Sequence, residues 1–471
     1  MLSFNRGIAL VLTVICLLFI SAINLSAATL TVTTLDDTND SVCDAQCSLR
    51  EAIEVAAPSD TIIFARQLRG GTIQLQSTLQ IKKRVTIDSP NKRRITIKGN
   101  NTFRIFDLIM TNAVGGRTII LDGLIIRDGF EAKGDGGGIN VDPSVSLIYI
   151  TNCAVLNNTA RRGGGIYMYG SGTLYLINSS VANNMATGDG GAGGIDDFRA
   201  VVYILNSTIS GNRSLSFVDG AGGIRLYEPN NWFINGSTIA DNSSNGSSYY
   251  SAGGLAALNG RGPGPLTNTI LARNNGLNPD YYGVSSGAYN SLIGITDSRS
   301  GFNNGVNGSI VGSAENPVDP HFSALADNGG GLPTHALLST SRAIDSGNND
   351  RSINQQGRPQ EIDQRTYNRI VNSTVDIGAY EFNSQPFATT STVSGQVTTA
   401  SGRGVFGARV VLRDENGAVK YALTNPFGYY RFVNIAADMV FTIECSGKGK
   451  IFAPQNVLVE ESTELVDFRA S

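Results

Sequence analysis

The chain has 471 residues, of which 41% are hydrophobic and 16% are charged, and its formal net charge is −3. This length predicts two or three domains with a long buried core. The weak charge provides no basic surface for nucleic acid and no acidic tail, so we expect no nucleic-acid partner.

Residues 1–28 have the features of a cleaved signal peptide. Arg6 precedes an apolar run at residues 8–23, and Ser26-Ala27-Ala28 supplies the small residues of a cleavage site. An uncleaved anchor is the alternative, although the run is barely long enough to span a bilayer. No later segment is apolar enough to cross a membrane, so we expect a secreted, extracellular or cell-surface protein.

Export favours a disulfide between Cys43 and Cys47, which lie four positions apart in a polar loop. A zinc site is the alternative, but zinc needs four ligands and no second pair or nearby His exists. Ser48 and Glu51 then form a capping box. We expect an amphipathic helix at residues 49–57 that covers the open end of a strand stack.

Short alternating runs follow this helix and predict the first strands. They are residues 61–64, 72–75, 85–87 and 95–97.

Glycine-rich turns recur from residue 136 onward, and each closes on an aliphatic residue. The closing residues are spaced by roughly 27 to 31 positions, which is typical of a stacked structural repeat. About a dozen residues after each turn, an Asn starts a polar-apolar run. The closing residues are Ile139, Ile166, Ile195, Ile224 and Leu255, and the Asn residues are Asn152, Asn178, Asn206, Asn235 and Asn268.

This unit is too short and too rich in β-branched residues for paired helices, so it predicts a right-handed parallel β-helix. Equivalent positions of successive coils would stack about 4.8 Å apart, with Asn side chains bonded to one another and glycine at positive φ. Period-two alternation predicts two inward columns. They are Ile148, Leu174 and Val202, and Ile150, Leu176 and Ile204.

Asp196 and Asp197 form the tight acidic pair of the repeats. Alternation would point Asp197 inward, where an unpaired carboxylate costs several kcal/mol. We therefore expect a one-residue bulge that turns Phe198 in and both Asp side chains out. Asp196 would then form an exposed ion pair with Arg225 on the next coil.

The alternative for these residues is a catalytic site. In a lyase, Asp side chains bind Ca²⁺ and Arg225 abstracts a proton, whereas a glycoside hydrolase needs two carboxylates. Further acidic residues in the glycine turns, Asp135, Asp189 and Asp219, allow a Ca²⁺ ladder, but their offsets differ and we expect solvated turns. We expect no resident metal or cofactor.

Aromatic residues lie three positions before the ladder Asn in successive coils: Tyr149, Tyr175, Tyr203 and Trp232. The flanking positions are mostly inward aliphatics, so this column is expected to face outward. It predicts either a self-stacking ladder, a floor under a C-terminal segment, or a strip that packs against sugar faces.

Residues 29–383 are thus assigned to the β-helix with its caps, and the small polar stretch at residues 384–392 to a linker. Residues 393–471 change period and predict six or seven short strands of a small β-sandwich. The expected strands are residues 393–397, 408–412, 419–423, 429–433, 439–443 and 457–459.

Motifs at both ends of the predicted β-helix carry a family resemblance. CSLREAI at residues 47–53, followed by DTIIF at 60–64, resembles the N-terminal cap of bacterial secreted β-helix proteins of the choice-of-anchor Q group, whose fold is pectin-lyase-like. DNGG (327–330), THALL (334–338), AIDSG (343–347), DQR (363–365) and DIGAYE (376–381) extend this resemblance. The resemblance implies architecture and export but no reaction, and we expect these C-terminal motifs to be structural.

SGQV at residues 394–397, GARVVL at 407–412 and GYYRF at 428–432 resemble a carboxypeptidase regulatory-like, prealbumin-like module. That module is similar to carbohydrate-binding-like folds and usually serves as a spacer. We expect a spacer here, with glycan binding as the alternative.

The pectin-lyase-like architecture includes polysaccharide lyases and hydrolases as well as inert adhesins, so fold alone does not decide function. The Gly-His-Gly of polygalacturonases is absent from this sequence. We expect a non-catalytic binding or adhesive protein with a polysaccharide or cell-surface glycan as partner. The alternative is a lyase or hydrolase of a uronate-containing polymer.

Overall fold

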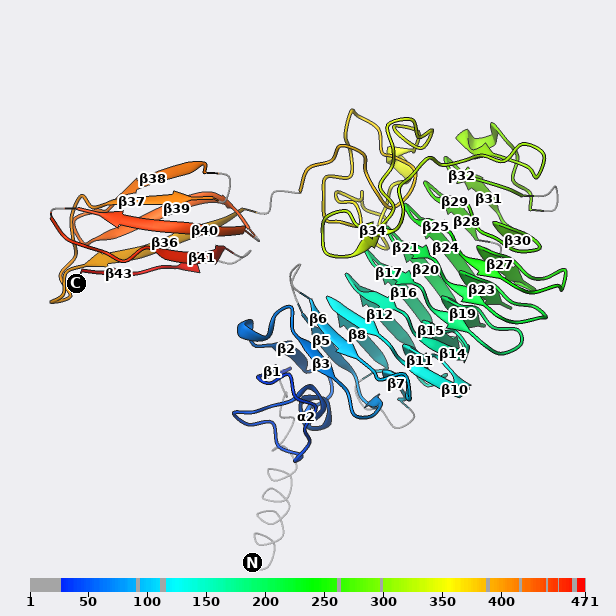
Figure 1. Ribbon diagram of the computed structural model, residues 1–471, viewed down its shortest axis with the longest axis horizontal. Helices are drawn as coiled ribbons and strands as arrows, with labels where there is room; N and C mark the ends of the chain where they lie inside the picture. The colour runs from blue at the N-terminus through cyan, green and yellow to red at the C-terminus, as the bar shows by residue number, and fades with distance from the viewer. Residues whose placement is uncertain are drawn as a thin grey trace, which may run out of the picture.

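The structure is a computed structural model that describes residues 27–470, except 90–93, 111–115, 261–263, 297–299, 387–389, 415–416, 438, 448 and 460–463. The expected signal peptide lies outside the described residues apart from Ala27 and Ala28. Strands dominate the described part of the chain, and Figure 1 shows those of the coils, from β1 to β33, stacked in chain order. The prediction of an all-β chain with a right-handed parallel β-helix is confirmed.

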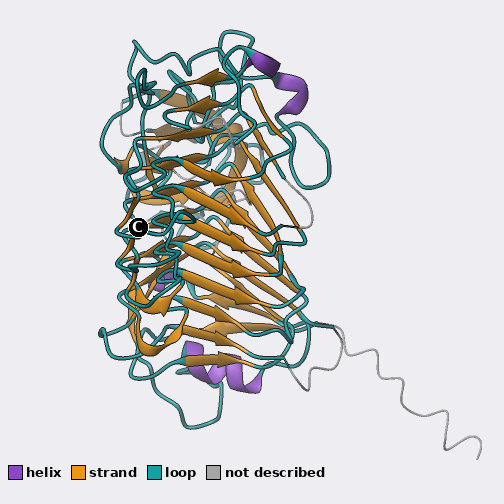
Figure 2. Cartoon of the chain, turned by 90° about the vertical axis from the view of Figure 1, so that its right-hand side faces the viewer, coloured by secondary structure: helices purple, strands orange, loops and turns teal. Residues whose placement is uncertain are grey.

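Four parallel sheets, which we name A to D, form the coils. Figure 2 shows strands lying one above another along the stack. Sheet A contains β1 (Thr29–Val32), β2 (Thr61–Phe64), β5 (Val85–Asp88), β8 (Thr118–Asp122), β12 (Leu147–Thr151), β16 (Thr173–Ile177), β20 (Val201–Leu205), β24 (Asn231–Asn235), β28 (Pro265–Thr267) and β31 (Gly287–Tyr289). Sheet B contains β3 (Thr72–Gln74), β6 (Ile95–Lys98), β9 (Leu124–Arg127), β13 (Ala154–Leu156), β17 (Ser180–Ala182), β21 (Thr208–Ser210), β25 (Thr238–Ala240), β29 (Ile270–Ala272), β32 (Leu292–Ile293) and β33 (Ile310–Val311).

Sheets C and D complete each coil, and the chain passes through the sheets in the order D, C, A, B. Sheet C contains β4 (Leu79–Ile81), β7 (Phe106–Leu108), β11 (Ile139–Val141), β15 (Ile166–Tyr169), β19 (Ile195–Phe198), β23 (Ile224–Tyr227), β27 (Leu255–Leu258) and β30 (Tyr281–Gly283). Sheet D contains β10 (Phe130–Asp135), β14 (Thr159–Arg162), β18 (Met185–Ala186), β22 (Arg213–Ser214) and β26 (Ser243–Ser244). The 3-10 helices are η1 (Arg66–Leu68), η2 (Val306–Gly308) and η3 (Asn349–Arg351).

The interior of the coils is a stack of apolar rungs. Both predicted inward columns of sheet A are fully buried and pair in register from β12 through β16 to β20. Alternation of period two therefore holds through the middle of the stack.

The glycine turns before sheet C have two physical causes. Gly136 and Gly163 have positive φ values of 69° and 57°, as expected for glycine. Gly193 does not. A Cβ on Gly193 would lie 2.5 Å from the backbone of Arg213, so glycine is needed there for close approach.

The Asn residues between sheets A and B adopt the left-handed conformation expected of a tight turn. Asn152, Asn178, Asn206 and Asn268 have φ values of 50°, 49°, 52° and 46°. In the coil of β24 this position is held by Gly236, with φ of 58°, and not by Asn235. The predicted Asn alignment is therefore wrong by one residue in that coil.

A second, buried Asn ladder runs between sheets B and D and was not predicted. Each Asn Nδ2 donates to the Oδ1 of the Asn on the next coil at 2.9 to 3.0 Å. Asn274 ends the ladder by donating to Asp280 Oδ1 at 2.8 Å. The members are Asn158, Asn184, Asn212, Asn242 and Asn274.

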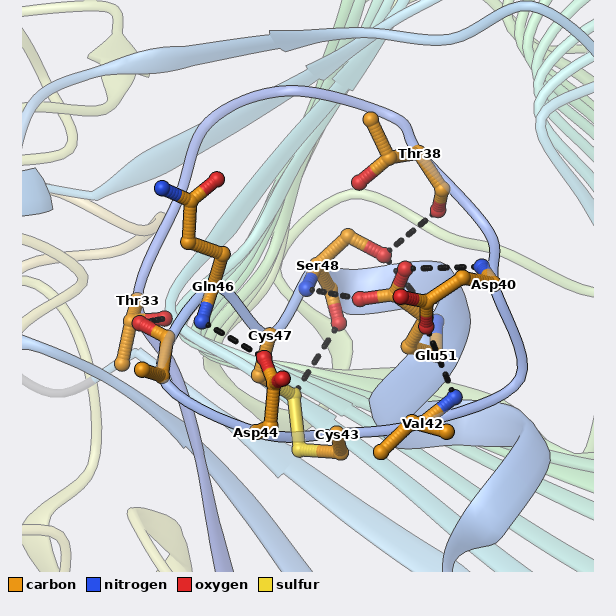
Figure 3. The surroundings of a disulfide bond; sticks show 11 residues. Thr33, Thr38, Asp40, Val42, Cys43, Asp44, Gln46, Cys47, Ser48 and Glu51 are labelled. Carbon is orange, nitrogen blue, oxygen red and sulfur yellow. Dashed lines mark hydrogen bonds between the residues drawn. A yellow bond between two sulfur atoms is a disulfide. The ribbon is translucent and has the colours of Figure 1, made fainter.

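The N-terminal end of the stack is covered by α2 (Leu49–Val55), which begins with the predicted capping box of Ser48 and Glu51. A disulfide joins Cys43 and Cys47 in the loop before the helix, and Figure 3 shows Ser48 and Glu51 beside it. Leu49, Ala52 and Ile53 are buried in the same cluster as the first coils.

Residues 313–386 pack along the flank of the coils. Phe322, Leu337, Ala343 and Ile377 are buried against outward residues of sheet B, such as Ile270. β34 (Ala326–Asp327) and β35 (Pro333–Thr334) form a small hairpin in this segment. The carboxylates of its motifs bond within the segment, as when Asp363 Oδ2 accepts from Arg365 Nε at 2.8 Å.

Residues 390–470 form a β-sheet region with its own apolar core. Two sheets enclose this core. One contains β36 (Thr390–Thr398), β39 (Tyr429–Ala436), β42 (Glu464–Leu465) and β43 (Phe468–Arg469), and the other contains β37 (Arg409–Arg413), β38 (Val419–Leu423), β40 (Met439–Ser446) and β41 (Gln455–Val459).

Candidate functional site

The acidic pair lies on β19, and the expected bulge is wrong. Residues 195–198 pair in continuous register with β15 and β23, so Asp196 points outward and Asp197 inward. Phe198 points outward and is half-buried. Both carboxylates are nevertheless fully buried.

Asp196 is buried because loops between sheets D and C fold across the outer face of sheet C. Ala192, Ala221 and Ala252 of these loops form a buried cluster with Ala256 of β27. Beneath them, Arg225 Nη1 donates to Asp196 Oδ1 at 3.0 Å, and the Ala192 amide donates to Oδ2 at 2.8 Å. The predicted cross-coil ion pair therefore forms, but it is buried and not exposed.

Asp197 occupies the inward column between Met168 and Leu226. Its Oδ1 accepts the Ala200 amide at 3.1 Å, while Oδ2 has no hydrogen-bond partner among the described residues. Burial raises the pKa of Asp197 to about 8, so the side chain is largely protonated at neutral pH. Protonation reduces the cost of a buried carboxyl, which removes the reason for a bulge.

Asp197 has the chemistry of an acid, Asp196 that of a carboxylate and Arg225 that of a cation. None of the three side chains is accessible to a substrate at the surface. Asp196 and Asp197 are fully buried and Arg225 nearly so. Acid catalysis on a sugar requires the carboxyl group within hydrogen-bond reach of the glycosidic oxygen. In this conformation the cluster therefore acts as a structural support beneath the loops.

The predicted aromatic column on sheet A is formed by its three tyrosines, but the predicted outward orientation of Trp232 is wrong. Tyr149, Tyr175 and Tyr203 stack with centroids 4.8 and 4.7 Å apart and interplanar angles of 7° and 8°. Phe233 follows Tyr203 in register, while Trp232 faces inward opposite Val202. Offset-stacked rings cover part of each other's faces, so the column is a self-stacking ladder with reduced area for sugar packing.

A second aromatic column, on sheet C, was missed. Tyr169, Phe198 and Tyr227 are aligned on β15, β19 and β23, with centroids 5.2 and 5.1 Å apart. We call these three residues the sheet C ladder. The sequence contains the pattern that predicts this ladder, because its three residues lie at the third position after each residue that closes a glycine turn.

A groove of about 480 Å³ lies beside the sheet C ladder, at the turns that lead to sheet A. Tyr169 is its aromatic wall and is 42% exposed. Arg199 Nε donates to Glu228 Oε2 at 2.9 Å, and Asn230 Nδ2 donates to the Arg199 carbonyl at 2.7 Å. The lining residues are Pro143, Tyr169, Gly170, Ser171, Arg199, Glu228 and Asn230.

The groove places charged residues at a backbone position that disfavours them. Gly170, Arg199, Glu228 and Asn259 follow equivalent ends of β15, β19, β23 and β27, and all have positive φ, at 109°, 75°, 49° and 51°. Glycine and asparagine adopt this conformation readily, whereas other residues lose about 1 kcal/mol. Non-glycine residues in such conformations cluster at functional sites. Together with the exposed ring of Tyr169, Arg199 and Glu228 make the groove the candidate binding site.

Two of the three acidic residues of the glycine turns, Asp135 and Asp219, bond to protein groups. Asp135 accepts from Arg162 Nη2 at 2.7 Å, and Asp219 accepts from the Ser248 hydroxyl. Among the described residues, no cluster of three His, Cys, Asp or Glu side chains could hold a metal ion. No helix within the same residues is long and apolar enough to cross a membrane.

Comparison with known proteins adds no family. No family model matches the chain, and no curated protein matches it.

Proposed function

We propose that this chain is an exported, non-catalytic protein that binds carbohydrate through the groove lined by Tyr169, Arg199, Glu228 and Asn230. The single observation that carries the proposal is this groove. It combines an exposed ring with hydrogen-bonding side chains at strained backbone positions. Sugars present apolar C–H faces and polar hydroxyl groups, and an aromatic wall beside polar groups complements both.

The charges of the groove favour neutral sugars. Arg199 and Glu228 neutralise each other at 2.9 Å, so the site carries no net cationic surface for a polyuronate. The guanidinium and the carboxylate remain partly exposed and can exchange part of their mutual bonding for sugar hydroxyls.

A binding role is favoured over catalysis by the placement of carboxylates. Glycoside hydrolysis ordinarily uses two carboxyl groups that flank the scissile bond. Glu228 is the only carboxylate among the lining residues of the groove, and Asp196 and Asp197 are buried. A lyase of uronate polymers would likewise need its proton-abstracting base at the surface.

Export and family assignment belong to the same proposal. The disulfide between Cys43 and Cys47 would persist outside a reducing cytosol. The end motifs and the parallel coils support membership of the choice-of-anchor Q group, and residues 393–471 are proposed to be a carboxypeptidase regulatory-like spacer at the cell surface. Intact mass of the exported protein would test removal of residues 1–28.

The experiment is co-sedimentation of residues 29–471 with a panel of insoluble neutral and uronate-containing polysaccharides. Tyr169→Ser should lower retention on a neutral polysaccharide by about fivefold, because one ring contributes about 1 kcal/mol. The double variant Arg199→Asn with Glu228→Asn should also lower it. The double variant places the residue type of Asn259 at the two equivalent turns, so its unfolding midpoint should match that of the parent protein.

Ultraviolet absorbance of unsaturated products and a reducing-end assay accompany the binding measurement. Product release above a heat-inactivated control, abolished by Asp196→Asn or Arg225→Ala, would contradict the non-catalytic proposal. Retention on no polysaccharide of the panel would contradict carbohydrate binding.

A further inference from the structure

An exposed apolar patch lies on the loops between sheets D and C. It shares no residue with the lining of the groove. Phe217, Tyr250 and Leu277 are 75%, 47% and 56% exposed. Val218 and Tyr249 are also exposed, and these five residues are called the loop patch. Contiguous exposed apolar residues on a soluble protein usually mark an interaction site.

The loops that carry the patch are neighbours on successive coils. The Ser247 hydroxyl donates to the Phe217 carbonyl at 3.0 Å, which joins the first loop to the second. Asn278 Nδ2 donates to the Tyr249 carbonyl at 2.9 Å, which joins the second to the third. With a coil spacing of about 4.8 Å, three loops present a strip about 10 Å long.

The backbone beneath the patch is well fixed. The Ser251 hydroxyl donates to the Val218 carbonyl at 2.7 Å, and Ala221 and Ala252 of the same loops are buried against sheet C. Tyr249 and Tyr250 meet edge to face at 5.8 Å and 76°, and both meet Tyr282 of β30 at 79° and 89°. The patch is therefore a pre-organised surface in which the rings of Tyr249 and Tyr250 are held at fixed angles.

The low charge of the three loops indicates which kind of ligand suits the patch. Residues 215–221, 245–252 and 275–279 contain Ser, Asn, Gly, Tyr and apolar residues, and Asp219 is their only ionisable acid or base apart from tyrosine. Asp219 already accepts the Ser248 hydroxyl. A charged polymer would find no complementary charge, so the chemistry favours a neutral ligand with hydroxyl groups and apolar faces.

The small size of the loop patch favours a small ligand over a large, stable protein partner. A stable protein interface engages roughly 20 to 30 residues on each side, whereas the loop patch has five exposed apolar residues on a strip of three loops. The strip suits two or three sugar units, whose C–H faces pack on the rings while Ser and Asn groups bond the hydroxyls.

We propose that the loop patch is a second carbohydrate contact, which binds the apolar faces of a neutral glycan independently of the groove. This inference rests on the proposed carbohydrate function and extends it to a second surface. Two contacts on one polymer would raise the overall affinity without any new groove contact, because the second binding event becomes intramolecular.

The test compares retention of three variants on the neutral polysaccharide that the parent protein binds best. Phe217→Ser with Tyr250→Ser removes the patch, Tyr169→Ser alters the groove, and Val284→Ser is the matched control. Val284 is 70% exposed and lies outside the patch. The patch variant should lose about thirtyfold in affinity, the sum expected for two rings, while the control stays within twofold of the parent in the same titration. All three variants should unfold cooperatively with midpoints within a few degrees of the parent, because the removed side chains lie at the surface.

The outcomes separate the two proposals. Unchanged affinity of the patch variant beside a weakened groove variant would overturn the loop patch and leave the groove proposal standing. A weakened patch variant with an unaffected groove variant would support the patch and overturn the groove. If the parent self-associates in sedimentation velocity, and the patch variant abolishes this association without changing glycan retention, the patch is a protein interface and the inference is wrong.

Discussion

Trp232 of β24 lies in register with Val202 of β20, and its side chain is 1% exposed. The next residue, Phe233, takes the outward position opposite Tyr203. The turn residue of this coil is Gly236, so the residue three positions before the turn is Phe233. A shift of one residue in a strand exchanges its inward and outward faces.

Trp232→Ala should therefore lower the free energy of unfolding by about 3 to 5 kcal/mol, because it leaves a large cavity in the core. Urea unfolding followed by circular dichroism measures this loss. Phe233→Ala is the matched comparison and should cost clearly less, since its ring is only half-buried. Equal losses for the two variants would contradict the register.

Asp196→Asn should destabilise the chain by about 3 kcal/mol, because it leaves the buried Arg225 guanidinium without its counter-charge. Thermal and urea unfolding would report the change. The surface pair Arg199 and Glu228 provides the control, since Glu228→Gln removes an exposed partner and should cost less than about 1 kcal/mol.

The raised pKa of Asp197 makes stability depend on pH. Its ordinary pKa is 3.8 and its folded value is about 8, so the folded state holds the proton more tightly. Its contribution is full below about pH 4 and is lost as the pH rises toward 8.

Asp197→Asn stays neutral and keeps an oxygen for the Ala200 amide. Its unfolding free energy should therefore fall less than that of the parent between about pH 5 and pH 9. Burial also raises the pKa of Glu381 to about 8, but this group is common to both proteins and cancels in the comparison. Parallel pH profiles for parent and variant would refute the assignment.

Asn212→Ala should cost about 3 kcal/mol or more, because it removes several buried hydrogen bonds and leaves their partners unsatisfied. Hydrogen exchange of neighbouring ladder amides would show whether the loss is local. Asn206→Gly is the comparison, because Gly236 occupies the same turn position on the next coil. This second variant should lose less, about 2 kcal/mol, for the bonds from Asn206 Nδ2 to Asn178 Oδ1 at 2.8 Å and to the Ile362 carbonyl at 3.1 Å.

Much of the fold could be predicted because local patterns repeat at every coil. Alternation around Ile148 and Ile150 identified inward columns, and Ser48 with Glu51 identified the cap. The predicted register is wrong at Trp232 because it aligns Asn235 with Asn206. In the structure, Gly236 occupies the turn position equivalent to Asn206. The buried ladder was also readable, since each of its Asn residues lies six positions after the turn residue, as Asn158 does after Asn152.

The candidate site was less predictable because its environment is made by residues distant in sequence and by loop conformation. Nothing local to Asp196 shows that Ala221 and Ala252 of later loops would cover sheet C. Alternation correctly predicts that Asp197 points inward. The free-energy cost expected for an ionised carboxylate does not apply, because burial raises the pKa of Asp197 and the side chain is largely protonated. Arg199 and Glu228 became informative only once their positive φ values were known.

Asp280 ends the buried Asn ladder and thereby limits where further coils can be added. Its Oδ1 accepts from Asn274 Nδ2, and its Oδ2 accepts the Ile295 amide at 2.6 Å. An ionised carboxylate has no hydrogen to donate onward. A gene duplication that copies a coil between Asn158 and Asn274 preserves every side-chain bond of the ladder, whereas a copy inserted after Asp280 begins without a donor. Variants of different length should therefore differ in the number of coils before this aspartate.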